Sequence, residues 1–172
     1  MVDEQTPDEG NFQEYIIETY FSMVYKLALS QMKNTANAED ICQDVFCKFL
    51  QKGSEIRNEA SIKAWLIRVT INSCKSIFRS GWFKKTVPLE EELEFDQQEK
   101  SDVYYAMLEL PQKYRAVIHL FYYEELTVRE IAEVLQVKES TVRSQLHRGR
   151  ELLKELLKGG YEDVSGMVQE SQ

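Results

Sequence analysis

Residues 127–150 constrain the fold more than any other segment, because they have the pattern of two helices joined by a turn of roughly three or four residues. Thr127 and Glu130 form a Ser/Thr-x-x-Glu capping box, in which each side chain satisfies a backbone N–H that helix geometry leaves unpaired. The first helix is therefore predicted to begin there. Apolar residues recur at helical spacing on one face of each helix, with one more in the turn: Ile131, Ala132 and Leu135, then Val137, then Val142 and Leu146. The segment is predicted to be a helix-turn-helix.

The second of these helices has a polar side that its apolar face leaves available. This side carries cationic and short hydrogen-bonding side chains: Glu139, Ser140, Arg143, Ser144, His147 and Arg148. Such residue types allow a helix to enter a major groove and to bind phosphates. The pattern predicts DNA binding, and the alternative is a basic amphipathic helix on an ordinary helical bundle.

Charge is distributed unevenly along the chain. The 172 residues have a formal net charge of -8, yet residues 61–85 contain six basic and no acidic side chains. Residues 136–158 contain six basic and three acidic side chains, and residues 86–112 contain one basic and eight acidic. Two positive segments in an acidic chain indicate two nucleic-acid contacts and acidic surfaces for another partner. A generally basic, nonspecific DNA-binding protein is excluded.

Composition argues against metal, membrane and catalytic functions. Cys42, Cys47 and Cys74 lack paired C-x-x-C spacing, so we expect no metal site and no cofactor. His119 lies in an apolar helical pattern and is interpreted as a core residue, and neither histidine belongs to a catalytic constellation, so the chain is not expected to be an enzyme. No run is apolar enough to span a bilayer and no apolar leader is present, which predicts a cytoplasmic protein with reduced thiols.

Helical periodicity dominates, and we expect an all-α protein of two small helical domains joined by a flexible acidic linker. The predicted parts are an N-terminal domain at 11–82, a linker at 83–100, a C-terminal helix-turn-helix domain at 101–158, and tails at 1–10 and 159–172.

The N-terminal domain is expected to hold three helices, over 12–33, about 37–51 and about 61–80. Asn37 is the expected N-cap of the second helix. Most of the aromatic side chains of the first helix are expected in the core: Phe12, Tyr15, Tyr20, Phe21 and Tyr25. In the C-terminal domain, Pro111 suits the first turn of a helix.

The third predicted helix mixes cations with flat and amide side chains: Lys63, Arg68, Lys75 and Arg79 beside Trp65, Asn72 and Phe78. This mixture can follow a phosphate backbone while offering surfaces to bases, and it suits a single strand better than a closed duplex. The alternative is that Trp65, Leu66, Val69 and Phe78 are core residues and that the cations form a solvated face.

The second predicted helix has an apolar stripe for packing, formed by Ile41, Val45, Phe46, Phe49 and Leu50. Its acidic and amide side chains project away from much of that stripe: Asp40, Gln43 and Asp44, with Cys47. An exposed ridge of this kind can dock a basic partner protein, or it is a plain solvated face.

The order of these parts resembles bacterial sigma factors of the extracytoplasmic-function (ECF) group. Residues 38–46, AEDICQDVF, resemble the family's core-binding helix, AED-x-x-Q-[DE]-x-F. Trp65-Leu66 followed by Asn72 and Arg79 resembles its promoter-melting helix. Residues 110–118, 130–135 and 141–150 resemble its L-P-x-x-x-R-x-V, E-I-A-x-x-L and T-V-x-S-x-L-x-R-[AG]-R run. The resemblance covers about residues 12–157. Departures occur at Gln136, where the family often has glycine, and at Ile71 and Ser76, where it commonly has Arg and Asp.

The resemblance implies a promoter-recognition protein that works with core RNA polymerase. It implies that Asp40, Gln43, Asp44 and Phe46 dock on the clamp helices of the largest subunit. For the -10 element, it implies that the non-template strand is held by Lys63, Trp65, Arg68, Asn72, Lys75 and Arg79, with a flipped-base pocket near Arg57 and Asn58. For the duplex -35 element, it implies reading by Thr141, Arg143, Ser144, His147 and Arg148. The linker would thread through the polymerase toward the RNA exit path.

The resemblance also implies an anti-sigma factor, in many cases membrane-anchored, and no small-molecule substrate. The rival interpretation is a stand-alone helix-turn-helix regulator whose N-terminal domain dimerises or senses a ligand. It accounts for the last part of the chain but not for the positive third helix.

Overall fold

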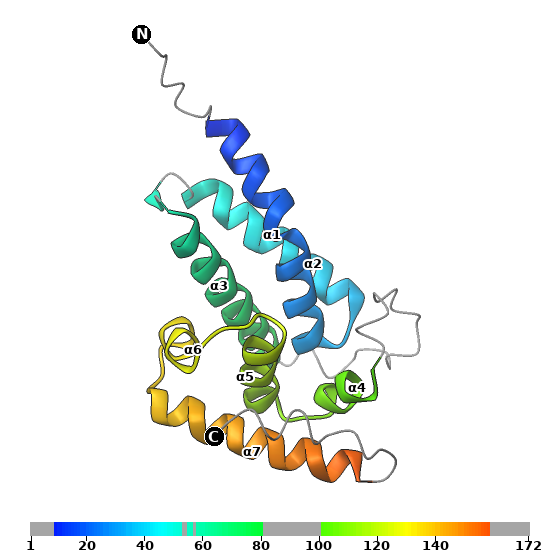
Figure 1. Cartoon of the computed structure of the whole chain (residues 1–172). Coiled ribbons are helices and arrows are strands. Elements are labelled where there is room, and N and C mark those ends of the chain that lie inside the picture. The colour runs from blue at the N-terminus through cyan, green and yellow to red at the C-terminus, as the bar shows by residue number, and fades with distance from the viewer. Residues whose placement is uncertain (1–8, 53–54, 57, 81–100, 159–172) are drawn as a thin grey trace. The chain divides into compact units, whose positions relative to one another are not determined.

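The computed structural model describes residues 9–52, 55–56, 58–80 and 101–158 (Figure 1). These residues form seven α-helices and no strand, which confirms the all-α expectation. The chain divides into two compact units, Met1–Val87 and Pro88–Gln172, and each is described by itself. The expected linker, both tails and Arg57 lie outside the described residues, apart from the last two residues of the N-terminal tail.

Unit 1 is a bundle of three helices that each pack on the other two (Figure 1). They are α1 (Glu9–Met32), α2 (Thr35–Lys52) and α3 (Glu59–Arg79). Their shared core is mainly aliphatic, and its fully buried members include Ile16, Leu27, Met32, Phe49, Ile62, Leu66, Ile67 and Ile71. Because core residues recur along the whole of α2 and α3, one side of each helix is fixed inside the bundle and the opposite side is left for other contacts.

The expectation that the α1 aromatic residues form the core is wrong. Tyr15 and Phe21 are 48% and 49% exposed, and Phe12, Tyr20 and Tyr25 are only partly buried. Aliphatic side chains occupy the inward positions of α1, so the rings cover the edges of the bundle. Phe21 stacks on Tyr25 and on Phe46, with centroid distances of 6.3 and 6.0 Å. The predicted tail is also too long by two residues, because α1 begins at Glu9.

The start of α2 differs from the sequence prediction, because its cap is Asn34 and not Asn37. The Asn34 side chain accepts a hydrogen bond from the backbone N–H of Asn37 at 2.9 Å, and its carbonyl accepts from Ala38 at 3.0 Å. Lys33 has a φ of 55°, a left-handed conformation that ends α1 and reverses the chain within two residues. At the other end of α2, Leu50 is 47% exposed and does not join the core as expected.

Unit 2 contains four helices, with α7 packed against each of the other three. They are α4 (Asp102–Leu108), α5 (Gln112–Tyr122), α6 (Val128–Leu135) and α7 (Glu139–Leu157). Pro111 occupies the N-cap of α5, one residue before the first turn where it was expected. Gly149 permits a close approach of α7 to α5, because a Cβ there would lie 3.0 Å from Cγ1 of Ile118. His119 is 2% exposed, which confirms its interpretation as a core residue.

Two features of the predicted helix-turn-helix are confirmed, namely its capping box and the burial of its apolar faces. Thr127 and Glu130 form the predicted capping box at the start of α6. Ile131, Ala132, Val142 and Leu146 are buried, and Leu135 is partly buried.

Arg115, the arginine of the L-P-x-x-x-R pattern, is a structural residue. It is 4% exposed, and its Nη1 donates to the carbonyl oxygens of Leu108 and Leu110 at 2.7 and 3.2 Å. These carbonyls belong to the end of α4 and the turn after it, where helix geometry leaves carbonyls without N–H partners. The side chain therefore ties the turn between α4 and α5 to the core of unit 2.

Replacing this arginine should destabilise unit 2. We expect Arg115→Met to cost about 2–4 kcal/mol, because the buried carbonyls lose a charged donor. Hydrogen exchange of the α5 amides measures the loss within this unit. Arg129→Met is the control, because the Arg129 side chain is 78% exposed. This replacement should change the free energy of unfolding by less than about 0.5 kcal/mol. Equal protection in both variants would contradict the structural role.

The turn between α6 and α7 stores strain at Gln136. This residue has φ 55° and ψ 45°, the left-handed conformation that a residue with a Cβ adopts at a cost. Its N–H donates to the carbonyl of Ala132, so it caps α6. The chain therefore makes the turn with glutamine in a conformation that glycine adopts readily.

Gln136→Gly should stabilise unit 2 by about 0.5–1 kcal/mol, because relief of this strain exceeds the entropy that glycine adds to the unfolded chain. The same replacement at Gln145, inside α7, should destabilise by about 1 kcal/mol. Chemical denaturation of the two variants checks the opposite signs. A loss of stability in Gln136→Gly would refute the strain.

Candidate nucleic-acid interface

The predicted DNA-contacting residues of α3 form one stripe, with a single exception. Positions 65, 68, 72, 75 and 79 are spaced by alternating steps of three and four, which places them on one side of a helix. Asn72 and Arg79 are exposed, and the other three are partly buried. Lys63 lies about 160° from Trp65 around the helix axis, and the structure does not bring it to this side. We call the stripe of Trp65, Arg68, Asn72, Lys75 and Arg79 the cationic stripe.

The alternative that Trp65, Leu66, Val69 and Phe78 of α3 are core residues is only partly right. Leu66 is fully buried, whereas Trp65, Val69 and Phe78 remain partly accessible. Trp65 packs beside Phe49 with a centroid distance of 6.4 Å, which fixes one part of the ring and leaves another part for contact. Ile71 is 2% exposed, so this departure from the family pattern is a core position and does not face a ligand.

Asn58, predicted near a base pocket, is the N-cap of α3. Its side-chain oxygen accepts from the N–H of Ser61 at 2.7 Å. The adjacent Glu59 accepts from the hydroxyls of Tyr20 at 2.9 Å and Tyr15 at 3.4 Å, which ties α1 to the start of α3. Burial, together with the hydrogen bond to Glu59, raises the pKa of Tyr20 to about 12. Its phenol therefore stays a donor at all physiological pH values.

The polar residues of α2 have the expected exposure, and Phe46 is buried as its place in the predicted apolar stripe requires. Asp40, Gln43, Asp44 and Cys47 are exposed. Phe46 is 7% exposed under Phe21, so a partner reaches this edge of the bundle mainly through the Phe21 ring. We call Asp40, Gln43 and Asp44 the acidic ridge.

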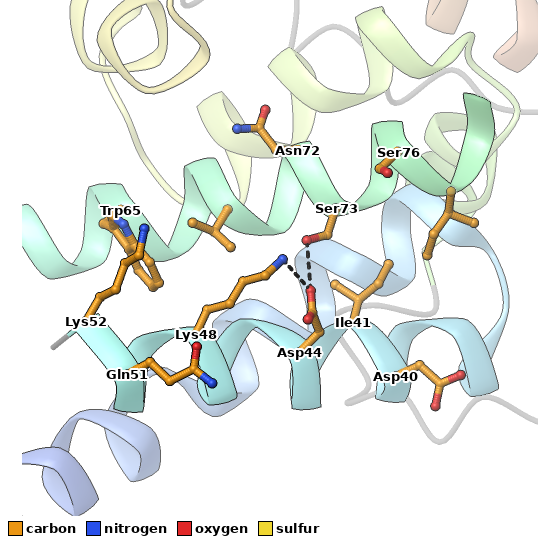
Figure 2. A pocket seen from close by; sticks show the side chains of 12 residues that line it. Asp40, Ile41, Asp44, Lys48, Gln51, Lys52, Trp65, Asn72, Ser73 and Ser76 are labelled. Atoms are coloured by element: carbon orange, nitrogen blue, oxygen red, sulfur yellow. Dashed lines mark hydrogen bonds and ion pairs between the residues drawn. The ribbon is translucent and has the colours of Figure 1, made fainter. Parts of the chain in front are cut away.

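An open groove of about 750 Å³ lies between α2 and α3, and residues of both the acidic ridge and the cationic stripe line it (Figure 2). Its lining from α2 is Asp40, Ile41, Asp44, Lys48, Gln51 and Lys52, and its lining from α3 is Trp65, Val69, Asn72, Ser73, Ser76 and Ile77. Asp44 is the centre of a polar link across it, because its Oδ2 lies 2.7 Å from Lys48 Nζ and accepts from Ser73 Oγ at 3.4 Å. Asn72, a member of the cationic stripe, points away from α2 (Figure 2).

In unit 2, the polar side of α7 is exposed as expected. Arg143, Ser144, His147 and Arg148 all face solvent, and Thr141 is partly buried. The two arginines have carboxylate partners on their own helix, since Arg143 lies 2.9 Å from Glu139 and Arg148 lies 3.2 Å from Glu151. His147 Nε2 lies 3.3 Å from Glu151 as well. These pairs are exposed and one turn apart, so each is worth only about 0.3–0.5 kcal/mol and exchanges readily for a phosphate.

Sequence reasoning missed two residues beside α7. A hollow of about 670 Å³ is lined by Lys113 and Tyr114 of α5 together with residues of α7 that include Ser140, Thr141, Ser144 and Arg148. Lys113 lies over the Tyr114 ring, 4.9 Å from its centroid. The sequence feature that could have identified them is their place in the first turn of a helix, directly after Pro111. The sequence does not show, however, that this turn lies beside α7. In contrast, Arg150 donates from Nε to the Tyr122 hydroxyl at 2.7 Å and serves packing.

Within the described ranges, no group of three or more His, Cys, Asp or Glu side chains can hold a metal ion. None of the helices described is long and apolar enough to cross a membrane.

Known proteins resemble this chain in both units. Residues 16–83 match the family model of sigma-70 region 2, and residues 100–153 match that of sigma-70 region 4. The RNA polymerase sigma factor SigV of Bacillus subtilis is 31% identical over 137 residues, covering 76% of this chain and 81% of that protein. The ECF RNA polymerase sigma factor SigW of the same organism is 27% identical over 171 residues, covering 88% and 91%.

Solved structures share the fold. The sigma factor RpoE from Bartonella quintana, in complex with the anti-sigma factor NepR, aligns with a TM-score of 0.72 at 20% identity, covering 86% of this chain and 98% of that one. CnrH, in complex with the cytosolic domain of CnrY, aligns with a TM-score of 0.66 at 19% identity, covering 91% and 93%. Both family regions match in order on the two helical units, and this chain belongs to the sigma-70 family of RNA polymerase sigma factors, in its extracytoplasmic-function group.

Proposed function

We propose that this chain directs promoter-specific initiation through three separate surfaces. The acidic ridge, with the Phe21–Phe46 edge, docks on the clamp helices of the polymerase largest subunit. The cationic stripe holds the non-template strand of the melted -10 element, and the exposed side of α7 reads the -35 element as duplex. The observation that carries this proposal is the match of region 2 and region 4, in order, to the two units that bear these surfaces.

The chemistry of transcription belongs to the polymerase in this proposal. The chain supplies recognition and is not an enzyme, needs no cofactor and takes no small-molecule substrate. It acts where RNA polymerase acts, in the cytoplasm. The division of the sequence into 11–82 for polymerase and -10 contacts, 83–100 as linker and 101–158 for -35 contacts belongs to the same proposal.

The residues of α7 divide the work of -35 recognition. Arg143 and Ser144 are placed to read base edges, and a bidentate arginine contact discriminates between bases by about 1–3 kcal/mol. Arg148 and Lys113 flank them on the two sides of the hollow between α5 and α7, where they bind backbone phosphates and fix the register. Reading thus rests on α7, and positioning rests on both helices.

The residues of α3 suit the -10 strand once it is single. A partly exposed Trp65 offers a stacking surface, and base–aromatic stacking contributes about 1–3 kcal/mol per base. Arg68, Lys75 and Arg79 follow one side of the helix and can track a phosphate backbone. Lys63, on the other side of α3, contributes through general electrostatic attraction at most. Arg57 and Asn58 remain the proposed border of a flipped-base pocket. The side-chain oxygen of Asn58 is already used as the cap of α3.

The net charge of -8 implies that the chain alone binds DNA weakly and depends on the polymerase to present it. We also propose that an anti-sigma factor holds the chain inactive by covering these surfaces. The support is that both aligned sigma factor structures are complexes, with NepR and with the cytosolic domain of CnrY.

Run-off transcription with core polymerase on genomic fragments from the source organism tests the function. Addition of the chain should produce discrete new transcripts, and Arg143→Ala with Arg148→Ala should lower them by about tenfold or more, since two phosphate or base contacts are lost. Arg129→Ala is the matched control, because Arg129 is an exposed cation on α6. No transcript, together with salt-sensitive duplex binding by a dimer of this chain alone, would support the stand-alone regulator instead.

Docking is tested separately by competition for core polymerase against a labelled chain. Asp40→Ala with Gln43→Ala should weaken binding by about tenfold, because two hydrogen-bonding side chains of the interface are removed. Glu18→Ala, which removes an exposed carboxylate of α1, should change it by less than about twofold. Unchanged affinity in the double variant would contradict docking through the acidic ridge.

A further inference from the structure

The groove between α2 and α3 has an acidic end and a basic end. Asp40 and Asp44 occupy the first part of its α2 wall, and Lys48 and Lys52 occupy the second part. Lys52 lies beside Trp65, and the Lys48 side chain extends toward Asp44 (Figure 2). Figure 2 shows both lysine side chains extending from α2 toward α3. Helix α2, which is proposed to dock on polymerase, thus also carries two lysines on the wall that it shares with α3, the proposed DNA-binding helix. The proposed function assigns no role to these lysines.

The basic end has the features of a seat for single-stranded DNA. Lys48 and Lys52 are one turn apart, with Cβ atoms about 6 Å from each other, so they can contact neighbouring phosphates. Across the groove lies the indole of Trp65, which can stack on a base and which also belongs to the cationic stripe. Cations along a groove with an aromatic platform are the usual means of binding a single strand without strict sequence preference.

In the structure, however, Lys48 is already neutralised. Its Nζ lies 2.7 Å from Asp44, and the two side chains are 47% and 50% exposed, so the pair is weak and exchangeable. The same Asp44 oxygen accepts from Ser73 of α3, which holds the carboxylate toward the groove. Any cation of a docking partner that takes Asp44 removes the counterion of Lys48.

We propose that the α2/α3 groove is a subsite for the single strand and that Asp44 competes with DNA phosphate for Lys48 until polymerase docking takes Asp44 as its own partner. This inference rests on the proposed function, because docking through Asp44 supplies the exchange. It gives a physical reason for weak DNA binding by the chain alone that does not depend on net charge. Lysine suits the role, since its flexible point charge moves from one anion to another without a fixed geometry.

The first test uses the full chain without polymerase and a labelled oligodeoxythymidine of about twelve nucleotides, within the range of single-strand site sizes. Fluorescence anisotropy at low salt should show that Asp44→Asn raises affinity about two- to threefold, because Lys48 no longer has to leave a carboxylate to bind phosphate. Glu39→Gln is the matched control, since it removes one exposed carboxylate from the same helix outside the groove, and it should act by less than about 1.5-fold.

The double variant Asp44→Asn with Lys48→Gln should lose the gain. If the gain in affinity persists without Lys48, or if Glu39→Gln gives the same gain, competition between Asp44 and phosphate for Lys48 is refuted. With core polymerase, Asp44→Asn should instead lower transcription because docking is weakened. A purely structural role of Asp44 would not give opposite effects in the two assays.

The second test is run-off transcription at raised salt with Lys48→Gln and Lys52→Gln. Each should lower the transcript about threefold or more, whereas Lys33→Gln, which alters a lysine after α1 that does not line the groove, should not. If the unaltered chain gives no transcript, the proposed function itself fails. If it transcribes and the groove lysines behave like Lys33, only the present inference fails.

Discussion

The burial of α3 against both α1 and α2 is the constraint on which the functional surfaces of unit 1 depend. Ile62, Leu66, Ile67 and Ile71 fix the rotation of α3 about its axis, because all four are nearly inaccessible. With that rotation fixed, residues spaced by three and four on the opposite side form the cationic stripe. The same argument applies to α2, whose buried Ile41, Val45 and Phe49 leave the acidic ridge outside. Core packing therefore decides which polar side chains become neighbours.

Electrostatics in both units follows one rule, in which exposed cations are held by exchangeable carboxylates. Lys48 pairs with Asp44 in unit 1, and Arg143 pairs with Glu139 in unit 2. Such exposed pairs stabilise the fold by a few tenths of a kcal/mol, so they do not hold the structure together. Their consequence lies in binding, because a phosphate or a partner cation replaces one member at little cost. An acidic chain can in this way carry two DNA-binding surfaces.

Much of the fold was predictable from sequence because its signals are local. The capping box of Thr127 and Glu130 depends on residues three apart, and the polar side of α7 follows from periodicity alone. The predictions that failed concern features that contacts between neighbouring helices determine. Phe21 was expected in the core, but apolar residues recur on more than one side of α1, and only its contacts with α2 and α3 decide which side faces inward. Asn34 and Asn37 are equally good caps by composition, and the left-handed Lys33 selects the first.

The candidate sites show the same limit. The residues of the cationic stripe were predictable as a set, but Lys63 was included because charge was counted along the sequence and not around the helix. The groove lysines and Lys113 were missed because each lines a hollow together with a second helix, and a single sequence does not show which helices meet.

Site-specific photo-crosslinking within a transcribing complex tests the central claim most directly, with a crosslinking residue at position 65 or at position 143. The account predicts that position 65 crosslinks to the non-template strand of the melted -10 element and that position 143 crosslinks to the duplex -35 element. Both crosslinks should require polymerase. Crosslinks from both positions to the same duplex segment, formed without polymerase, would contradict it.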